Sequence, residues 1–231
     1  MNFILQFFNI VLYKPLLNIL VLLWVYIPGS DFGLAIIVLT LTIKLILHPI
    51  SLKSLRSQRK LSDLQPKIKE VQNKFKNDKQ RQSQAMMELY QKEKINPFSG
   101  CLPILLQLVI MIALYQVVLK GFQPEVLKAS LYSFVPNSSA LNYSFLWLFN
   151  LRHPVFIVVL ALITGIAQFF QAKTATPQFA KDKNSAATNF SSIMQTQMLY
   201  FFPLLSVFIV WKFGAAVGLY WLTSTLFSIG E

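Results

Sequence analysis

Long apolar runs alternate with shorter polar segments along this chain. A run of about 20 apolar residues is long enough for a helix to cross a bilayer. Five runs of nearly this length predict an all-α membrane protein with five transmembrane helices, organised as a single membrane domain over residues 1–231. The last two runs are short and are expected to thin the bilayer or form a shallow hairpin. The five runs are residues 32–50, 101–119, 154–172, 197–211 and 215–229.

A further apolar run, residues 3–27, differs because Lys14 and Pro15 interrupt it. A lysine at mid-bilayer costs about 2.5–3.5 kcal/mol, and proline removes a helix hydrogen bond. We therefore predict an amphipathic helix that lies in the membrane interface, while a spanning helix stays open as the alternative. The turn after this helix contains Pro28, and Ser30 or Asp31 is the expected N-cap of the first span.

Residues 51–96 are polar and strongly basic, with 12 Lys and Arg against 5 Asp and Glu. Apolar side chains recur with heptad-like spacing at Leu64, Ile68, Val71 and Phe75. A turn at residues 77–78 would let a second helix fold back on this seam. We therefore predict an antiparallel helical hairpin outside the bilayer.

Composition narrows the function classes. The chain has 55% hydrophobic and 13% charged residues, which excludes a disordered chain and argues against a soluble enzyme. Its one cysteine, Cys101, cannot form a disulfide within the chain, and no Cys or His cluster predicts a metal. His48 and His153 each precede a proline and are expected to mark helix ends. We expect no cofactor and no metal.

The net charge of +12 is interpreted first as topology. The positive-inside rule places the basic hairpin in the cytoplasm. Counting spans then puts the N-terminus and residues 120–152 outside, and residues 173–196 and the C-terminus inside. Binding of the hairpin to ribosomal RNA at the membrane surface is compatible with the same charge.

Polar residues inside the predicted spans are the candidate site. Thr40, Lys44 and His48 recur at intervals of four along the first span. Lys44 either extends its ammonium to the membrane surface or lies in the wall of a water-filled cavity. Other spans carry polar residues at helical spacing, and each such stripe alone could simply join helices. Together they favour a hydrophilic groove open to the cytoplasm. These residues are Gln107, Thr164, Gln168, Gln171, Tyr220, Ser224 and Ser228.

No Asp or Glu lies in the core of a predicted span, which argues against proton-coupled transport. No nucleophile and base, phosphate loop or metal set is evident, so we expect no enzyme activity.

The hairpin and second span carry a specific motif. Residues 89–90, 96–103, Gln107 and residues 114–115 together resemble the signature of the YidC/Oxa/Alb membrane protein insertases. Lys14-Pro15, Gln65-Pro66 and residues 218–221 extend the resemblance to nearly the whole chain. It is similar to the short bacterial form, without a large external domain.

This resemblance implies a groove that is open to the cytoplasm and the lipid. The family's hallmark arginine is replaced here by Lys44, which keeps the charge but loses the planar fork of the guanidinium. Val109 stands where the family often has proline. The resemblance also implies the groove residues, which are Lys44, Thr40, Gln107, Gln168, Gln171, Tyr220, Trp221 and Ser224.

The implied function is insertion and folding of nascent membrane proteins, alone or with the Sec translocon. Many members hold the ribosome with a basic tail, and this sequence has none after Glu231. We therefore expect ribosome and client contacts at Arg56, Arg59, Lys60, Lys67, Lys181 and Lys183. Membrane lipids are further partners. We expect a monomer in the bacterial plasma membrane. A small-solute transporter or channel is the alternative, as is a chaperone that needs a translocon.

Overall fold

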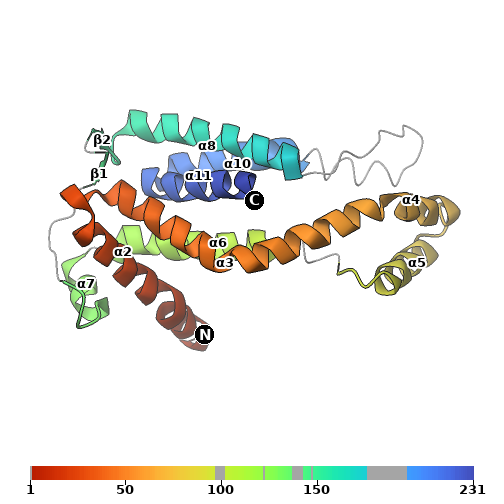
Figure 1. Ribbon diagram of the computed structural model, residues 1–231, viewed down its shortest axis with the longest axis horizontal. Coiled ribbons are helices and arrows are strands. Elements are labelled where there is room, and N and C mark those ends of the chain that lie inside the picture. The colour runs from red at the N-terminus through yellow and green to blue at the C-terminus, as the bar shows by residue number, and fades with distance from the viewer. Residues whose placement is uncertain (1, 97–101, 122, 137–142, 147, 176–196) are drawn as a thin grey trace.

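The computed structural model describes residues 2–96, 102–121, 123–136, 143–146, 148–175 and 197–231. Figure 1 shows a bundle of helices with a small helical hairpin projecting from one end and two short strands at the other. The bundle and its N-terminal helix comprise α1 (Asn2–Phe8), α2 (Lys14–Tyr26), α3 (Phe32–Asp63), α6 (Leu102–Gln116), α8 (Pro154–Ala175), α10 (Phe202–Phe213) and α11 (Ala215–Gly230). The elements at its ends are α4 (Gln65–Lys74), α5 (Lys79–Lys92), α7 (Pro124–Ser130), β1 (Ser144–Phe145) and β2 (Phe149–Asn150).

The N-terminal run forms one continuous helix, in which a π-helical turn at Asn9–Tyr13 joins α1 to α2. Pro15 directly follows this π-helical turn, at the start of α2. The helix lies obliquely to the rest of the bundle (Figure 1). Its apolar stretch, Phe3–Tyr26, is long enough to cross a membrane. Its length therefore permits a spanning helix, and the interfacial position stays a prediction.

The turn between α2 and α3 confirms the predicted cap. Gly29 has φ 77°, a left-handed conformation that suits glycine. The indole Nε1 of Trp24 donates to the carbonyl of Ser30 at 2.6 Å and holds the turn against α2. Asp31 is the N-cap, because its Oδ1 accepts from the backbone N–H of Leu34 at 2.8 Å.

Helix α3 corrects the prediction that His48 marks a helix end. It continues through His48 and Pro49 to Asp63. The bounds of the first span, residues 32–50, stay a prediction. Proline removes only one backbone hydrogen bond, and helices on both sides of that point keep their own bonds. Figure 1 shows a bend near the middle of α3. The first span and the start of the predicted hairpin are therefore one helix.

The antiparallel hairpin is confirmed for α4 and α5, with its turn at the predicted position. Asp78 caps α5 by accepting from the N–H of Arg81 at 3.0 Å. Two of the four predicted seam residues, Leu64 and Ile68, are buried. The Nε2 of Gln82 donates to the carbonyl of Gln72 at 2.9 Å and links the two helices.

Helices α8, α10 and α11 pack side by side and form one part of the bundle, next to α3 and α6 (Figure 1). Gly218 of α11 permits close packing, because a Cβ there would lie 2.7 Å from Val210 and 2.8 Å from Leu160. Three apolar helices in the described residues reach membrane-spanning length, and they include α3 and α8. The other predicted spans lie in shorter apolar helices, Leu105–Lys120, Leu199–Phe213 and Ala215–Gly230. A count of five spans therefore stays a prediction.

The end of the bundle opposite the hairpin is closed by α7 and by a small feature that an all-α prediction omits. Strands β1 and β2 pair antiparallel, with Ser144 opposite Asn150. Asn18, buried in α2, fixes this end. Its Nδ2 donates to the carbonyl of Ser130 at 3.0 Å, and its Oδ1 accepts from the N–H of Tyr132 at 2.7 Å.

Candidate functional site

Lys44 lies on α3 in the wall of a cavity, half-buried between helices. Its ammonium donates to the hydroxyl of Ser228 on α11 at 3.0 Å. Gln107 of α6 and Tyr220 of α11 line the same cavity. The volume is about 30 Å³, which holds about two water molecules and is too small for a polypeptide. The cavity brings together three of the eight predicted groove residues.

A ladder of hydrogen bonds joins the polar stripe of α11 to its neighbours. Ser224 donates to the side-chain carbonyl of Gln107 at 2.8 Å. The hydroxyl of Tyr220 lies 3.5 Å from the backbone carbonyl of Gln107. These bonds hold α6 against α11, so the stripe joins helices as well as contributing polar atoms to the cavity.

The remaining amide residues form a second cluster on another face of α11. The side-chain carbonyl of Gln168, on α8, accepts from the indole Nε1 of Trp221 at 2.9 Å and from Thr225 at 3.3 Å. Its Nε2 donates to Gln171 at 3.0 Å. The amide cluster, defined as Gln168, Gln171, Trp221 and Thr225, is neutral.

Thr40 has a different role from the other predicted groove residues. It is buried, and its hydroxyl donates to the carbonyl of Ile36 in its own helix at 2.6 Å. A threonine bonded in this way satisfies its hydroxyl locally in an apolar helix. Three of the predicted groove residues thus line the Lys44 cavity, Ser224 lies next to it, three form the amide cluster, and Thr40 bonds to its own helix.

A third group of polar side chains, at the end of the bundle nearer the hairpin, was not predicted as a site. His48 and Ser51 follow Lys44 on one face of α3, at intervals of four and three. Glu231, directly after α11, contacts both of them. His48 Nδ1 is 2.5 Å from Glu231 Oε1, and the hydroxyl of Ser51 donates to Oε2 at 2.9 Å. The helical spacing from Lys44 could have indicated that His48 and Ser51 lie on the same face of α3. Only the fold shows that Glu231 contacts them.

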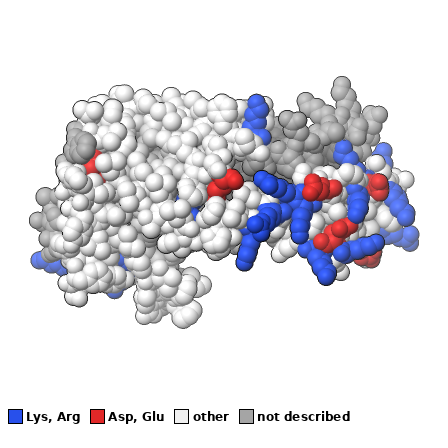
Figure 2. Space-filling model, in the orientation of Figure 1, with Lys and Arg blue, Asp and Glu red and all other residues white. Residues whose placement is uncertain are grey.

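Positive charge is concentrated on the hairpin and the adjoining part of α3, while the visible face of the bundle is largely uncharged (Figure 2). Arg56, Arg59, Lys60 and Lys67 are all exposed, as a contact surface requires. Lys181 and Lys183 lie outside the described residues, as do Cys101 and most of the motif at 96–103.

One ion pair in this region shifts the pKa of a carboxyl group. The ammonium of Lys67 donates to Glu93 at 2.6 Å. This hydrogen bond, together with the positive charge, lowers the pKa of the Glu93 carboxyl below its usual value. The pair links the start of α4 to the residue after α5.

Among the described residues, no three His, Cys, Asp or Glu side chains come close enough to hold a metal ion. The charged groups at the site are the ammonium of Lys44 and the carboxylate of Glu231, among amide and hydroxyl groups. The ammonium of Lys44 can attract and orient an anionic group.

Comparisons with known proteins identify relatives of this chain. Residues 24–231 match the model of the family described as 60Kd inner membrane protein. A protein of Clostridium tetani (strain Massachusetts / E88), named Membrane protein insertase YidC, is 36% identical over 204 residues. The match covers 88% of this chain and 81% of that protein.

A protein of the same name from Francisella tularensis subsp. novicida (strain U112) is also 36% identical over 204 residues. The match covers 87% of this chain and 32% of the Francisella protein. The chain thus spans about a third of the length of that relative. It covers most of the clostridial one.

Proposed function

The chain belongs to the YidC/Oxa/Alb family of inner membrane proteins, and on this premise we propose that it is a membrane protein insertase and chaperone. Its clients are nascent membrane proteins. Its relatives and its apolar helices identify it as a multi-pass protein of the inner membrane. The observation that carries the proposal is Lys44, a half-buried cation that lines a cavity between apolar helices.

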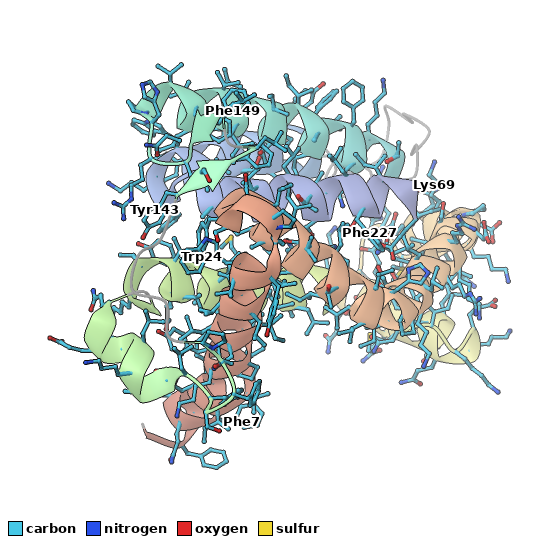
Figure 3. All side chains as sticks on the ribbon, turned by 60° about the vertical axis from the view of Figure 1, so that its left-hand side comes forward. Phe7, Trp24, Lys69, Tyr143, Phe149 and Phe227 are labelled. Atoms are coloured by element: carbon cyan, nitrogen blue, oxygen red, sulfur yellow. The ribbon has the colours of Figure 1, made fainter. Side chains whose placement is uncertain are left out.

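The proposed orientation follows from charge. The basic hairpin and the end of α11 face the cytoplasm, and α7 with the two strands faces outward. The N-terminus lies outside, and α1 and α2 lie in the outer interface. Exposed apolar side chains on α1, such as Phe3 and Phe7, support this position because they can dip into lipid (Figure 3 labels Phe7).

The proposed mechanism begins when a client's short hydrophilic tail enters the cavity from the cytoplasm. Lys44 attracts an acidic residue in that tail, in surroundings where apolar helices weaken charge screening. The cavity holds only about two waters, so the helices that line it must separate to admit the tail. The bonds that must give way are those of Ser224 and Ser228.

The client's apolar segment meanwhile moves along lipid-facing surfaces of the bundle. Helix α8 presents a row of exposed apolar side chains, including Val155, Leu162 and Phe170, and α11 presents Leu226. Transfer of the apolar segment into lipid supplies the free energy, about 0.8 kcal/mol for each CH₂ group buried. No nucleotide hydrolysis by this chain is required.

Partners of the insertase follow from its surfaces. The exposed basic side chains Arg56, Arg59, Lys60 and Lys67 suit the ribosome and anionic lipid headgroups. We propose that Lys181 and Lys183 add to this surface from the cytoplasmic loop. The insertase acts as a monomer, alone or beside the Sec translocon.

The test uses purified protein in liposomes with a single-span client that has an acidic N-terminal tail. Protease protection scores insertion by the native protein and by Lys44→Ala. We expect insertion by the native protein and a drop of about tenfold in the variant, equivalent to 1.4 kcal/mol. Lys44→Arg is the matched control and should retain insertion.

Other outcomes separate the alternatives. Equal insertion by native protein and Lys44→Ala contradicts the electrostatic mechanism. Client binding without insertion would mean that the chain is a chaperone that needs a translocon. Ion or solute flux through the liposomes in the absence of a client would favour a channel or transporter.

A further inference from the structure

The polar faces of α3 and α11 meet along their length and end in a carboxylate. On α11, Ser224, Ser228 and Glu231 follow one another at intervals of four and three. Ser228 contacts Lys44, and Glu231 contacts His48 and Ser51. Figure 1 shows this end of α11 beside the middle of α3. The two stripes are therefore in register, with Glu231 at the end nearer the hairpin.

The carboxylate of Glu231 is well enclosed. Its side chain is 5% exposed, whereas that of His48 is 40% exposed. Burying a charged carboxylate is costly unless its oxygens are hydrogen-bonded. Both oxygens have a donor here, because a carboxylate can only accept and the Nδ1 of His48 must donate. Phe227, labelled in Figure 3, packs edge-on against the His48 ring, 6.2 Å between centroids.

The same carboxylate lies next to the cavity. Ser51, which donates to Glu231, also lines the cavity with Lys44. The ammonium of Lys44 itself donates to Ser228, so Glu231 is a nearby charge and not a direct ligand of Lys44. Opposite charges attract across several ångströms where apolar helices weaken screening, so the carboxylate of Glu231 offsets part of the positive charge of Lys44. An acidic client residue that enters the cavity therefore meets a cation whose charge is already partly offset.

We propose that Glu231 is an internal counter-charge beside the cavity, which weakens the attraction of Lys44 for acidic client residues and so sets client specificity. The inference rests on the proposed insertase function. A client tail with little negative charge gains too little from Lys44 to separate the helices at the cavity, whereas a more acidic tail gains enough.

The experiment compares two single-span clients in liposomes, identical except for one Asp or one Asn in the N-terminal tail. Native protein, Glu231→Gln and Ser51→Ala are assayed for insertion of each client. Glu88→Gln, at an exposed position of the hairpin, is the matched control for loss of one carboxylate. Thermal unfolding in detergent is measured for every variant.

In Glu231→Gln, the ratio of Asp-client to Asn-client insertion should rise about two- to fivefold, the change expected when one opposite charge near a partly exposed lysine is removed. Ser51→Ala keeps every charge but removes one hydrogen bond from Glu231, so it should shift the ratio the same way by less. Glu88→Gln should leave the ratio unchanged.

An unchanged ratio in both Glu231→Gln and Ser51→Ala overturns the proposal. So does an equal loss of both clients, which would make Glu231 only a tether between α11 and α3. If Glu231→Gln does not fold, the ratio in Ser51→Ala decides. Native protein that inserts neither client contradicts the insertase function itself, which is a separate result.

Discussion

The two ends of the helix bundle use polar groups differently. At the end near α7, the amide of Asn18 bonds to the carbonyl of Ser130 and the N–H of Tyr132. Phe149 stacks on Phe156 at 5.2 Å, and the guanidinium of Arg152 lies 3.7 Å above the Tyr143 ring. Figure 3 shows the labelled side chains Tyr143 and Phe149 at this end.

At the end near the hairpin, a few polar and charged groups lie among aliphatic side chains around a cavity. Lys44, Ser51 and Gln107 line it, and Glu231 lies beside it. A neutral amide with fully matched partners stabilises one arrangement. A cation that faces a cavity can attract an anionic group that enters it. The end near α7 therefore favours one closed arrangement, whereas the end near the hairpin can bind an anionic group.

The largest effect is expected on stability, from a substitution that removes the hydrogen bonds of Asn18 at the end near α7. Asn18→Leu keeps the volume but leaves the Ser130 carbonyl and the Tyr132 N–H without their side-chain partner. The free energy of unfolding should fall by about 1–3 kcal/mol, because two partly buried backbone groups lose their hydrogen bonds to Asn18. Thermal unfolding in detergent measures it. Asn9→Leu, at an exposed site on the same helix, should change stability by less than about 0.5 kcal/mol. Equal unfolding temperatures for the two variants would show that Asn18 does not hold this end.

A smaller effect, on specificity and not on stability, is expected at the open end. Lys44→Glu should favour clients with basic tails over clients with acidic tails. The ratio of their insertion should change by about tenfold, equivalent to 1.4 kcal/mol. Lys53→Glu makes the same charge change at an exposed site of α3 and should shift the ratio much less. If both variants shift it equally, overall charge controls selection and the cavity does not.

The smallest effect is expected in the hairpin, outside both ends. Lys67 lowers the pKa of the Glu93 carboxyl, so the ion pair stabilises the folded hairpin above the usual carboxyl pKa. This contribution is lost as the pH falls through the lowered pKa. Hydrogen exchange of α4 and α5 should therefore be slightly faster in Glu93→Gln than in native protein at neutral pH, and equal in acid. Glu88→Gln should match native protein at both. A difference that persists in acid would exclude the ion pair as its cause.

Local signals in the sequence predicted much of the fold. Hydrophobic runs located the bundle helices, the Asp31 cap was recognisable from its place before an apolar run, and the hairpin turn was found near Asp78. The family resemblance is confirmed by the comparisons. The proline after His48 led to a wrong prediction of a helix end, because a proline inside a helix removes only one backbone hydrogen bond and α3 continues past it.

Contacts between distant positions could not be predicted in the same way. Asn18 bonds to residues more than 110 positions away, and Glu231 reaches Ser51 over 180 positions. The sequence placed Tyr220 and Trp221 on the same helix. Only the packing of that helix shows that Tyr220 lies near Gln107 and that Trp221 belongs to the amide cluster. The direction of a side chain within a bundle depends on all the neighbouring helices at once.

The unbroken course of α3 has a mechanical consequence. Its 32 residues extend about 48 Å, well beyond the roughly 30 Å of a bilayer core. A stiff rod of this kind transmits a push on the hairpin directly into the bundle. The missing hydrogen bond at Pro49 makes one point of the rod easier to bend, and that point lies between Lys44 and Ser51. A force on the hairpin therefore bends α3 mainly at the cavity wall.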